Sequence, residues 1–306
     1  MKKLYYYCLA AILVACNVED ENLLEKGKSA QLTISTEIVT TRSFHTNIYN
    51  AFGEGSKIGL WIFDKNGNDY SRYTNETTTW NRKATYENST WIMEEPMTLT
   101  DVPAKVVAYY PYQENASSGV RTRAIPPTLR ILRPIAEIDI ASYGHNDGQP
   151  DYLWGESVDS VDNQHPNARI QFKHVLPRIT FEVQKSNGNS TDAIYLRNAI
   201  LKNSTDNGNT ICTTGFLYEN GSIGKTTVTG QSITNSLLAP VLLDNGETRT
   251  FDFHVLPTEV TEGSVILSIE ISKGSLGSLQ YYDIPIPATK WESGKQYTYP
   301  VKLNIQ

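Results

Sequence analysis

The chain has few of the residues that cross-link a protein or attract nucleic acid. Three cysteines in 306 residues are too few to hold a chain of this length together by disulfides, so buried apolar side chains must stabilise the fold. The formal net charge is −6. Because phosphate groups bind to basic surfaces, we expect no nucleic acid among the partners. The apolar run at residues 4–15 is shorter than the roughly 20 residues that a helix needs to cross a bilayer.

The motifs of common enzyme classes are also missing from the sequence. It contains no G-x-S-x-G nucleophile elbow, no phosphate loop and no dinucleotide fingerprint. The five histidines show no metal-ligand spacing with one another or with cysteine. The paired carboxylates of a glycosidase meet only in space, and no pair stands out in the sequence. We therefore predict no enzyme activity, no catalytic residue, no metal site and no cofactor.

The pattern that the chain does have is the polar–apolar alternation typical of β-strands. It is clear at residues 31–38, and dense apolar runs of strand length follow at 57–63 and 104–110. Loops rich in Asn, Gly, Ser and Asp separate such runs, and no window of helical length holds an amphipathic repeat well. Short strands joined by turns predict an all-β protein made of β-sandwiches. Further strands are expected at 168–183 (two strands around Pro177), 194–201, 210–218, 249–256, 264–272, 279–286 and 296–305.

The stretch 141–167 is polar and loop-like, which makes it the best candidate for a boundary between two domains. The length of the chain suits two domains of ordinary size. We divide the chain into residues 1–15 as a signal peptide, 16–29 as a lipidated tether, 30–160 as an N-terminal β-sandwich domain and 161–306 as a C-terminal β-sandwich domain.

The amino-terminal residues predict the compartment. Lys2 and Lys3 precede the apolar run, an arrangement typical of a secretory signal peptide. The sequence LVAC (13–16) resembles the lipobox of bacterial lipoproteins, which implies cleavage before Cys16 and transfer of a diacylglyceryl group to its thiol, with palmitate among the acyl chains. Acyl chains strengthen membrane binding by about 0.8 kcal/mol per buried methylene, so the lipid would anchor the protein in the outer membrane. The alternative is an ordinary signal peptide with an incidental cysteine.

An acidic cluster, Glu19-Asp20-Glu21, follows the lipidation site. It resembles the surface-export signal of lipoproteins in gut and oral anaerobes; the alternative is a solvated linker. Cys212 is the one cysteine outside this region and the signal peptide, and it lies in a strand-like run. A lone cysteine in such a run is usually a small buried hydrophobe, so we predict a structural role for it.

Five motifs follow one another between residues 40 and 305. They are TRS (41–43) with AFGEGSKIGL (51–60), VAYYPY (107–112), DYLWG (151–155), FKHVLPRITF (172–181) and WESGKQYTY (291–299). In this order they resemble the motifs of the fimbrillin family, the subunits of type V pili in outer-membrane anaerobes. Ser56 stands where the family usually has an aspartate.

The resemblance implies two tandem β-sandwich (transthyretin-like) domains and a structural role in a cell-surface fimbria that supports adhesion. It implies export as a lipoprotein, assembly by strand exchange, and other pilus subunits as partners, with a host or bacterial surface receptor as a further candidate. It also implies trypsin-like cleavage after an arginine. Arg42 lies in a polar context just after the first strand and is the candidate; the alternative is an ordinary surface arginine.

The strand expected at residues 31–39 is the candidate for displacement. Its apolar residues Leu32, Ile34 and Ile38 face one way, and burying the three contributes roughly 5–9 kcal/mol. A whole domain has only about 5–15 kcal/mol of stability. Loss of the strand would leave an apolar groove and an unpaired sheet edge, which a strand from a neighbouring subunit can fill by β-augmentation.

The carboxyl end contains a candidate donor strand. Its apolar residues alternate with polar ones, so all five can share one face of an extended strand. Pro300 falls on the polar face and forfeits one ladder hydrogen bond, which is tolerable at a sheet edge. The alternative is a last strand packed permanently in its own domain. The apolar residues are Tyr297, Tyr299, Val301, Leu303 and Ile305.

A second class of function stays open at this point. The chain could be a surface lipoprotein that binds glycans or host proteins without polymerising, with exposed Trp80, Trp91 or Trp154 as a stacking platform. The alternative for these tryptophans is ordinary packing. The sequence also leaves open whether a pilus subunit of this kind would act in the stalk, at the base or at the tip.

Overall fold

The computed structural model describes residues 29–39, 51–114, 133–140, 149–186, 193–204, 210–226, 231–274 and 277–305. These residues form twenty-one strands, one short 3-10 turn (η1, Tyr70–Tyr73) and no α-helix. The predicted all-β class is confirmed. In the same ranges there is no helix with the length and hydropathy required to cross a membrane.

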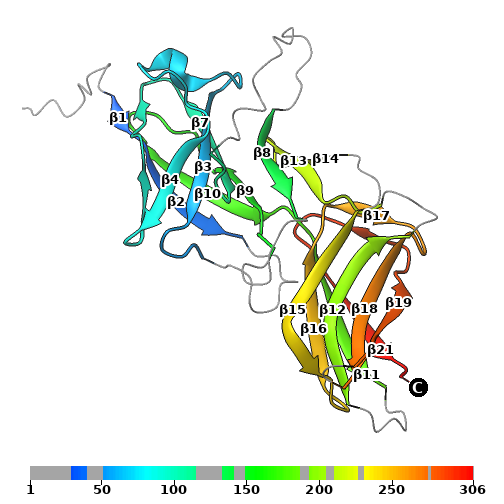
Figure 1. Ribbon diagram of the computed structural model, residues 1–306. Coiled ribbons are helices and arrows are strands. Elements are labelled where there is room, and N and C mark those ends of the chain that lie inside the picture. Colours follow the sequence, from blue (N-terminus) through cyan, green and yellow to red (C-terminus); the bar gives the residue numbers. More distant parts are fainter. Residues whose placement is uncertain are drawn as a thin grey trace, which may run out of the picture.

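The first group of strands builds one large sheet (Figure 1). Seven strands follow one another across it in the order β2-β10-β9-β7-β3-β4-β5. A two-residue strand, β1 (Ala30–Gln31), pairs with β6 (Thr98–Leu99) beside this sheet. The seven strands are β2 (Thr33–Ile38), β3 (Lys57–Asp64), β4 (Arg82–Glu87), β5 (Thr90–Met93), β7 (Ala104–Tyr110), β9 (Leu153–Ser157) and β10 (Asn167–His174).

The second group of strands is a sandwich of two main sheets, drawn green to red in Figure 1. One sheet has the order β16-β11-β21, and the other has the order β15-β12-β18-β19. Their strands are β11 (Arg178–Lys185), β12 (Ile194–Asn203), β15 (Ser232–Leu242), β16 (Thr248–His254), β18 (Val265–Lys273), β19 (Leu279–Pro285) and β21 (Gln296–Leu303). Small sheets complete the group: β14-β13-β8 and β17-β20, from β8 (Pro134–Asp139), β13 (Thr214–Tyr218), β14 (Ile223–Lys225), β17 (Thr258–Val260) and β20 (Thr289–Trp291).

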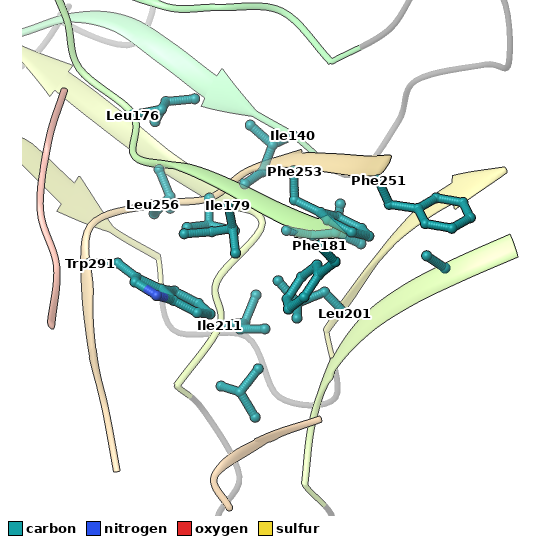
Figure 2. Packing of buried hydrophobic residues seen from close by; sticks show 14 of the residues in the cluster. Ile140, Leu176, Ile179, Phe181, Leu201, Ile211, Phe251, Phe253, Leu256 and Trp291 are labelled. Atoms are coloured by element: carbon teal, nitrogen blue, oxygen red, sulfur yellow. The ribbon is translucent and has the colours of Figure 1, made fainter. Parts of the chain in front are cut away.

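Aromatic side chains fill the core of the sandwich. Phe181 of β11 meets Phe253 of β16 edge to face, with ring centroids 5.8 Å apart. Trp291 and Leu201 lie in the same cluster (Figure 2). Edge-to-face contact suits the charge distribution of aromatic rings, so this pair stabilises the contact between the neighbouring strands β11 and β16 beyond simple burial of area.

Two hydrophobic clusters underlie the two groups of strands. One lies within the large sheet and includes Ile58, Met97 and Phe172. The other fills the sandwich and also reaches Trp61 and Tyr109 on the opposite face of the large sheet. The two groups of strands therefore share a continuous apolar contact.

The sequence-based boundary between residues 160 and 161 stays a prediction, and the strand pairing favours a different position. It falls between β9 and β10, which are paired antiparallel with Phe172 opposite Gly155. The stretch 141–167, expected to be a loop, contains β9, and a Cβ atom at Gly155 would lie 2.7 Å from the Gln171 carbonyl oxygen. This glycine allows β9 and β10 to approach closely, so the short strand did not show the usual apolar run. We propose a boundary after His174, with β8 assigned to the C-terminal sheets because it pairs with β13.

Two glutamine side chains cover strand edges where the groups meet. The amide of Gln149 accepts from the His254 N–H (2.7 Å) and donates to the His254 carbonyl (3.1 Å). Gln113 makes the same pair of bonds with Glu137 of β8, accepting from its N–H at 2.8 Å and donating to its carbonyl. A side-chain amide has the same donor and acceptor as a peptide group, so each glutamine satisfies one edge residue and blocks further pairing there.

Candidate functional site

The segment 29–39 runs along the edge of the large sheet. Its β2 part pairs in parallel with β10, from Thr33 beside Asn167 to Ile38 beside Phe172. Further backbone bonds continue this contact at both ends: the Leu32 N–H donates to the Met97 carbonyl, and the Val39 N–H donates to the Phe172 carbonyl, both at 2.8 Å. In the described part of the chain no strand pairs with the outer edge of β2.

The inward side chains of this segment contact the cluster inside the large sheet. Leu32 is 5% exposed, whereas Ile34 and Ile38 are half-buried against the same cluster. The outward residues Thr33 and Glu37 are exposed. Because two of the three apolar side chains are only half-buried, their combined contribution lies toward the lower end of roughly 5–9 kcal/mol.

A tryptophan from the far edge of the sheet also contacts β2. Trp91 of β5 donates from its indole Nε1 to the Thr36 hydroxyl at 3.0 Å. The strands β2 and β5 lie at opposite ends of the strand order, so the sheet curves until its two edges meet. This contact was missed by the sequence analysis, since two residues 55 positions apart in different strands give no local signal.

An aromatic group lies beneath β2 and remains connected to the body of the sheet. Phe52 meets Trp91, Tyr110 and Phe172 edge to face, with centroid distances of 5.0, 5.6 and 5.1 Å. Trp91 also contacts Tyr86 of β4 at 5.1 Å. These rings belong to residues on the carboxyl side of position 50, so a cut between β2 and Phe52 would leave the group in place.

Three predicted features of the amino-terminal region lie outside the described residues. These are the lipidated Cys16, the acidic cluster at 19–21 and the candidate cleavage site Arg42. Lipidation, export and cleavage therefore stay predictions. The described ranges end at residue 39 and resume at residue 51, so Arg42 falls in the segment that connects β2 to Phe52.

The carboxyl-terminal strand β21 is also an edge strand, and it runs parallel to β11. Its register pairs Gln296 with Arg178 and Leu303 with Lys185. The alternation expected from the sequence is present: Val301, Leu303 and Ile305 are at most 6% exposed, while Tyr297 and Tyr299 are half-buried against the sandwich core. The candidate donor residues are thus buried within their own domain.

Hydrogen bonds in the W-x-x-G-x-x-Y-x-Y motif fix the start of β21. The buried Trp291 indole donates to the Tyr299 hydroxyl at 3.0 Å. The Tyr297 hydroxyl donates to the Lys290 carbonyl at 2.6 Å and accepts from the Glu292 N–H at 3.0 Å. Gly294 has φ +66°, a conformation that glycine adopts without strain and that lets the chain turn into β21. The motif therefore builds a turn whose side chains hold the start of the last strand.

The three tryptophans considered as a glycan platform are occupied by packing. Trp80 stacks on Trp61 with centroids 5.4 Å apart, and the Arg133 guanidinium lies 4.9 Å from its ring. Trp154 is 8% exposed, and the backbone of Gly221 lies against its ring. Trp91 is held by Phe52 and Thr36 as described above. None of the three presents a free ring face of the kind that stacks on a sugar.

Two histidines lie buried at the junction of β10 with the sandwich. His174 Nδ1 lies 2.6 Å from the Asp151 carboxylate, and both side chains are buried. Burial lowers the pKa of His254, and the charges of Asp151, His174 and Arg178 act on it as well. In the described residues no group of histidines, cysteines and carboxylates could hold a metal ion. Cys212 is buried, in agreement with its expected structural role.

The fold and the edge strands define a class of protein: an all-β chain of packed sheets whose first and last strands both lie at sheet edges. A sequence profile of the fimbrillin-like family matches residues 41–306, so the chain belongs to that family. The resemblance found in the sequence motifs is thereby confirmed. No curated protein sequence matches the chain.

Solved structures share this fold. A candidate cell adhesion protein from Bacteroides ovatus is 15% identical with a TM-score of 0.61, covering 90% of this chain and 93% of its own. Another from Bacteroides uniformis is 17% identical with a TM-score of 0.57, covering 90% and 94%. A fimbrial protein from Bacteroides vulgatus is 14% identical with a TM-score of 0.51, covering 89% and 95%. At these identities the likeness establishes the fold.

Proposed function

We propose that the protein is a structural subunit of a cell-surface fimbria, a type V pilus, that assembles by strand exchange and supports adhesion. Membership of the fimbrillin-like family over residues 41–306 supports a pilus-type subunit rather than an enzyme. The observation that carries the assembly mechanism is the position of β2. It is a half-exposed edge strand whose inward face lies on a core made by later residues.

Loss of the segment 29–39 would expose both polar and apolar groups. The outer edge of β10 would lose its partner from Asn167 to Phe172. Met97 and Phe172 would lose part of their apolar cover. An edge that is unpaired and apolar is a template for another strand, and a strand from a neighbouring subunit satisfies both needs by β-augmentation.

In this proposal the chain reaches the cell surface as a lipoprotein. Acylation of Cys16 holds it on the outer membrane, and a trypsin-like protease then cuts after Arg42. The cut separates the anchored segment, which includes β2, from the body that begins at Ser43. Because β2 stays in place until the chain is cut at Arg42, export of the protein acylated at Cys16 can precede polymerisation.

The candidate donor strand contains Tyr297, Tyr299, Val301, Leu303 and Ile305. Donation to a neighbour would break the register of β21 with β11 and the bond from Trp291 to Tyr299. These contacts favour retention in this chain. A subunit that accepts a strand at β10 but retains its own last strand suits an end of the fimbria, at its tip or its base, better than the stalk.

The test is cleavage of the full chain with an arginine-specific protease. We expect a new amino end at Ser43 and, on addition of other pilus subunits, species that resist dissociation in SDS. The matched control is Arg42→Ala, which should remain uncut at this position and monomeric under the same treatment. If the wild-type protein is cut at Arg42 and stays monomeric with every subunit offered, strand exchange at β10 is refuted.

A further inference from the structure

Trp91 of β5 contacts β2 across the curved sheet. This contact bears on which side chains a replacement for β2 can carry. We consider an incoming strand that pairs with β10 in the direction and register of β2. Backbone hydrogen bonds do not discriminate between sequences, because every residue offers the same donor and acceptor. Side chains at the inward positions do, and in the segment 29–39 four such positions lie at residues 32, 34, 36 and 38.

Three of the four inward positions require only an apolar side chain. Leu32, Ile34 and Ile38 contact the cluster inside the large sheet. The remaining position differs, because Thr36 accepts the hydrogen bond from Trp91 Nε1 at 3.0 Å. An indole N–H is a donor only, so an apolar side chain at this position would remove its partner. Loss of a hydrogen bond to a partly buried donor weakens binding.

The indole ring is held in position independently of β2. The ring centroid of Trp91 lies 5.0 Å from that of Phe52 and 5.1 Å from that of Tyr86. The backbone of Trp91 is also paired with that of Tyr86 between β4 and β5. The direction of the N–H is therefore set by residues that stay in the body after a cut at Arg42. After the cut, the Trp91 N–H would therefore lie at a fixed position in the groove left by β2.

We infer that the groove left by β2 selects a strand with the pattern apolar-x-apolar-x-hydroxyl-x-apolar, and that Trp91 is the residue that reads the hydroxyl. This inference rests on the proposed strand exchange. It names the partner by chemistry: an extended segment of another subunit that runs parallel to β10 and carries Thr or Ser at its third inward position.

The last strand of this same chain does not fit the pattern. Its five inward residues can occupy the four inward positions of the groove in two ways when the strand runs parallel to β10, beginning at Tyr297 or at Tyr299. The third position is then Val301 or Leu303, and neither has a hydroxyl. The occupant that the groove specifies is therefore a strand of different sequence, so the neighbour at this site is a different subunit rather than a second copy.

The test measures binding of synthetic strands to the full chain after cleavage at Arg42. The probes are dye-labelled peptides of residues 29–39 with Thr36, with Thr36→Val and with Thr36→Ser, and binding is followed by fluorescence anisotropy. Valine has nearly the same shape as threonine and accepts no hydrogen bond. We expect about fivefold weaker binding for Thr36→Val, which corresponds to about 1 kcal/mol, and affinity near that of the native peptide for Thr36→Ser.

A second protein turns this comparison into a double-mutant cycle. In Trp91→Phe the ring remains and the donor is gone, so Thr36 and Thr36→Val peptides should bind equally well. A peptide of residues 296–305 should bind the wild-type groove more weakly than the native peptide does and should not respond to Trp91→Phe. Tight binding of that peptide with dependence on Trp91 would instead identify a second copy as the specified neighbour.

The outcomes separate the inference from the proposed function. If no peptide binds the cut protein, strand exchange at β10 fails, and the specification fails with it. If the native peptide binds and Thr36→Val binds equally well to the wild-type protein, strand exchange stands and the reading of the hydroxyl by Trp91 is wrong. The comparison of the native and Thr36→Val peptides uses only the cut wild-type protein, so it does not depend on how well a Trp91 variant folds.

Discussion

The strands β2 and β21 lie near the two ends of the described chain, occupy equivalent places and are held very differently. Both are edge strands, and in the described residues each pairs with a single strand in parallel, β2 with β10 and β21 with β11. These partners are consecutive in the chain. Yet Ile34 and Ile38 of β2 are only half-buried and Leu32, just before the strand, is buried, whereas Val301 and Leu303 of β21 and Ile305, two residues after it, are all buried. In the proposed exchange, edge position would allow either strand to leave, and its shallower burial makes β2 the strand that we expect to leave.

Tyrosine hydrogen bonds add to this difference. Tyr297 and Tyr299 tie β21 to residues 290–292, whereas β2 is held by the bond from Trp91 to Thr36 and by surface bonds from Ser35 to Asn167 and from Gln171 to Glu37. Amide side chains also cover single residues of neighbouring edges, at Glu137 and His254. Of β2 and β21, β2 is therefore the strand that we expect to separate from its sheet more easily.

The largest effect is expected from removing Trp291, which precedes the turn into β21 and is bonded to Tyr299. Replacing the buried Trp291 by alanine should lower the free energy of unfolding by about 3–5 kcal/mol, because it leaves a cavity and removes the bond to Tyr299. Urea denaturation followed by circular dichroism measures the change. Tyr281→Ala is the control: this aromatic residue is 58% exposed on β19, so its loss should change stability by less than about 0.5 kcal/mol. Equal effects of the two substitutions would contradict the structure.

A matched pair of truncations sharpens the comparison between the two strands. Leu303→Ala removes a fully buried side chain from β21 and should cost about 2–4 kcal/mol. Ile34→Ala removes a half-buried one from β2 and should cost about 1–2 kcal/mol. Both are read from chemical denaturation of the uncut chain. A larger loss for Ile34→Ala than for Leu303→Ala would reverse our ranking of the strands.

Acid is expected to weaken the sheet that holds β21. Burial holds the pKa of His254, at the end of β16, below its usual 6.5, with Asp151 and Asp252 opposing this shift and His174 and Arg178 reinforcing it. As the pH falls below 6.5 the unfolded chain takes up a proton here before the folded chain does, so the free energy of unfolding decreases.

The pH effect is measured by urea denaturation at about pH 7.5 and about pH 5. His254→Asn removes the titrating group and keeps a polar side chain, so it should reduce the loss of stability on acidification. An identical pH dependence in wild-type protein and His254→Asn would show that this histidine does not contribute to it.

Local patterns in the sequence predicted the strands and not their partners. Alternation at residues 31–38 and 296–305 gave two correct inward faces, and Pro177 correctly marked a turn between β10 and β11. The parallel pairing of Thr33 with Asn167 joins segments more than 130 positions apart, and side-chain alternation contains no information about it. Trp91 was considered a surface platform for the same reason: its partner Thr36 is 55 positions away, so the residues around Trp91 do not indicate the contact.

The difference between the two boundaries has a similar origin. In β9, Gly155 replaces an apolar side chain at the place where the strand approaches β10 most closely, so the segment resembled a loop. A glycine inside a short strand between polar stretches signals close backbone contact only when the neighbouring strand is known. The strand of the motif DYLWG, β9, lies on the N-terminal side of both boundaries, whereas β10, its partner in the same sheet, falls beyond residue 160.

Hydrogen exchange of the uncut full chain, read by mass spectrometry, tests the central claim most directly. It compares the backbone amides of residues 33–38 with those of residues 296–303 in one sample. If β2 is the replaceable strand, its amides exchange through local opening and are markedly less protected than those of β21, which open with the whole sandwich. Protection of β2 equal to or greater than that of β21 would mean that the amino-terminal strand is fixed in its sheet, and the exchange model would be contradicted.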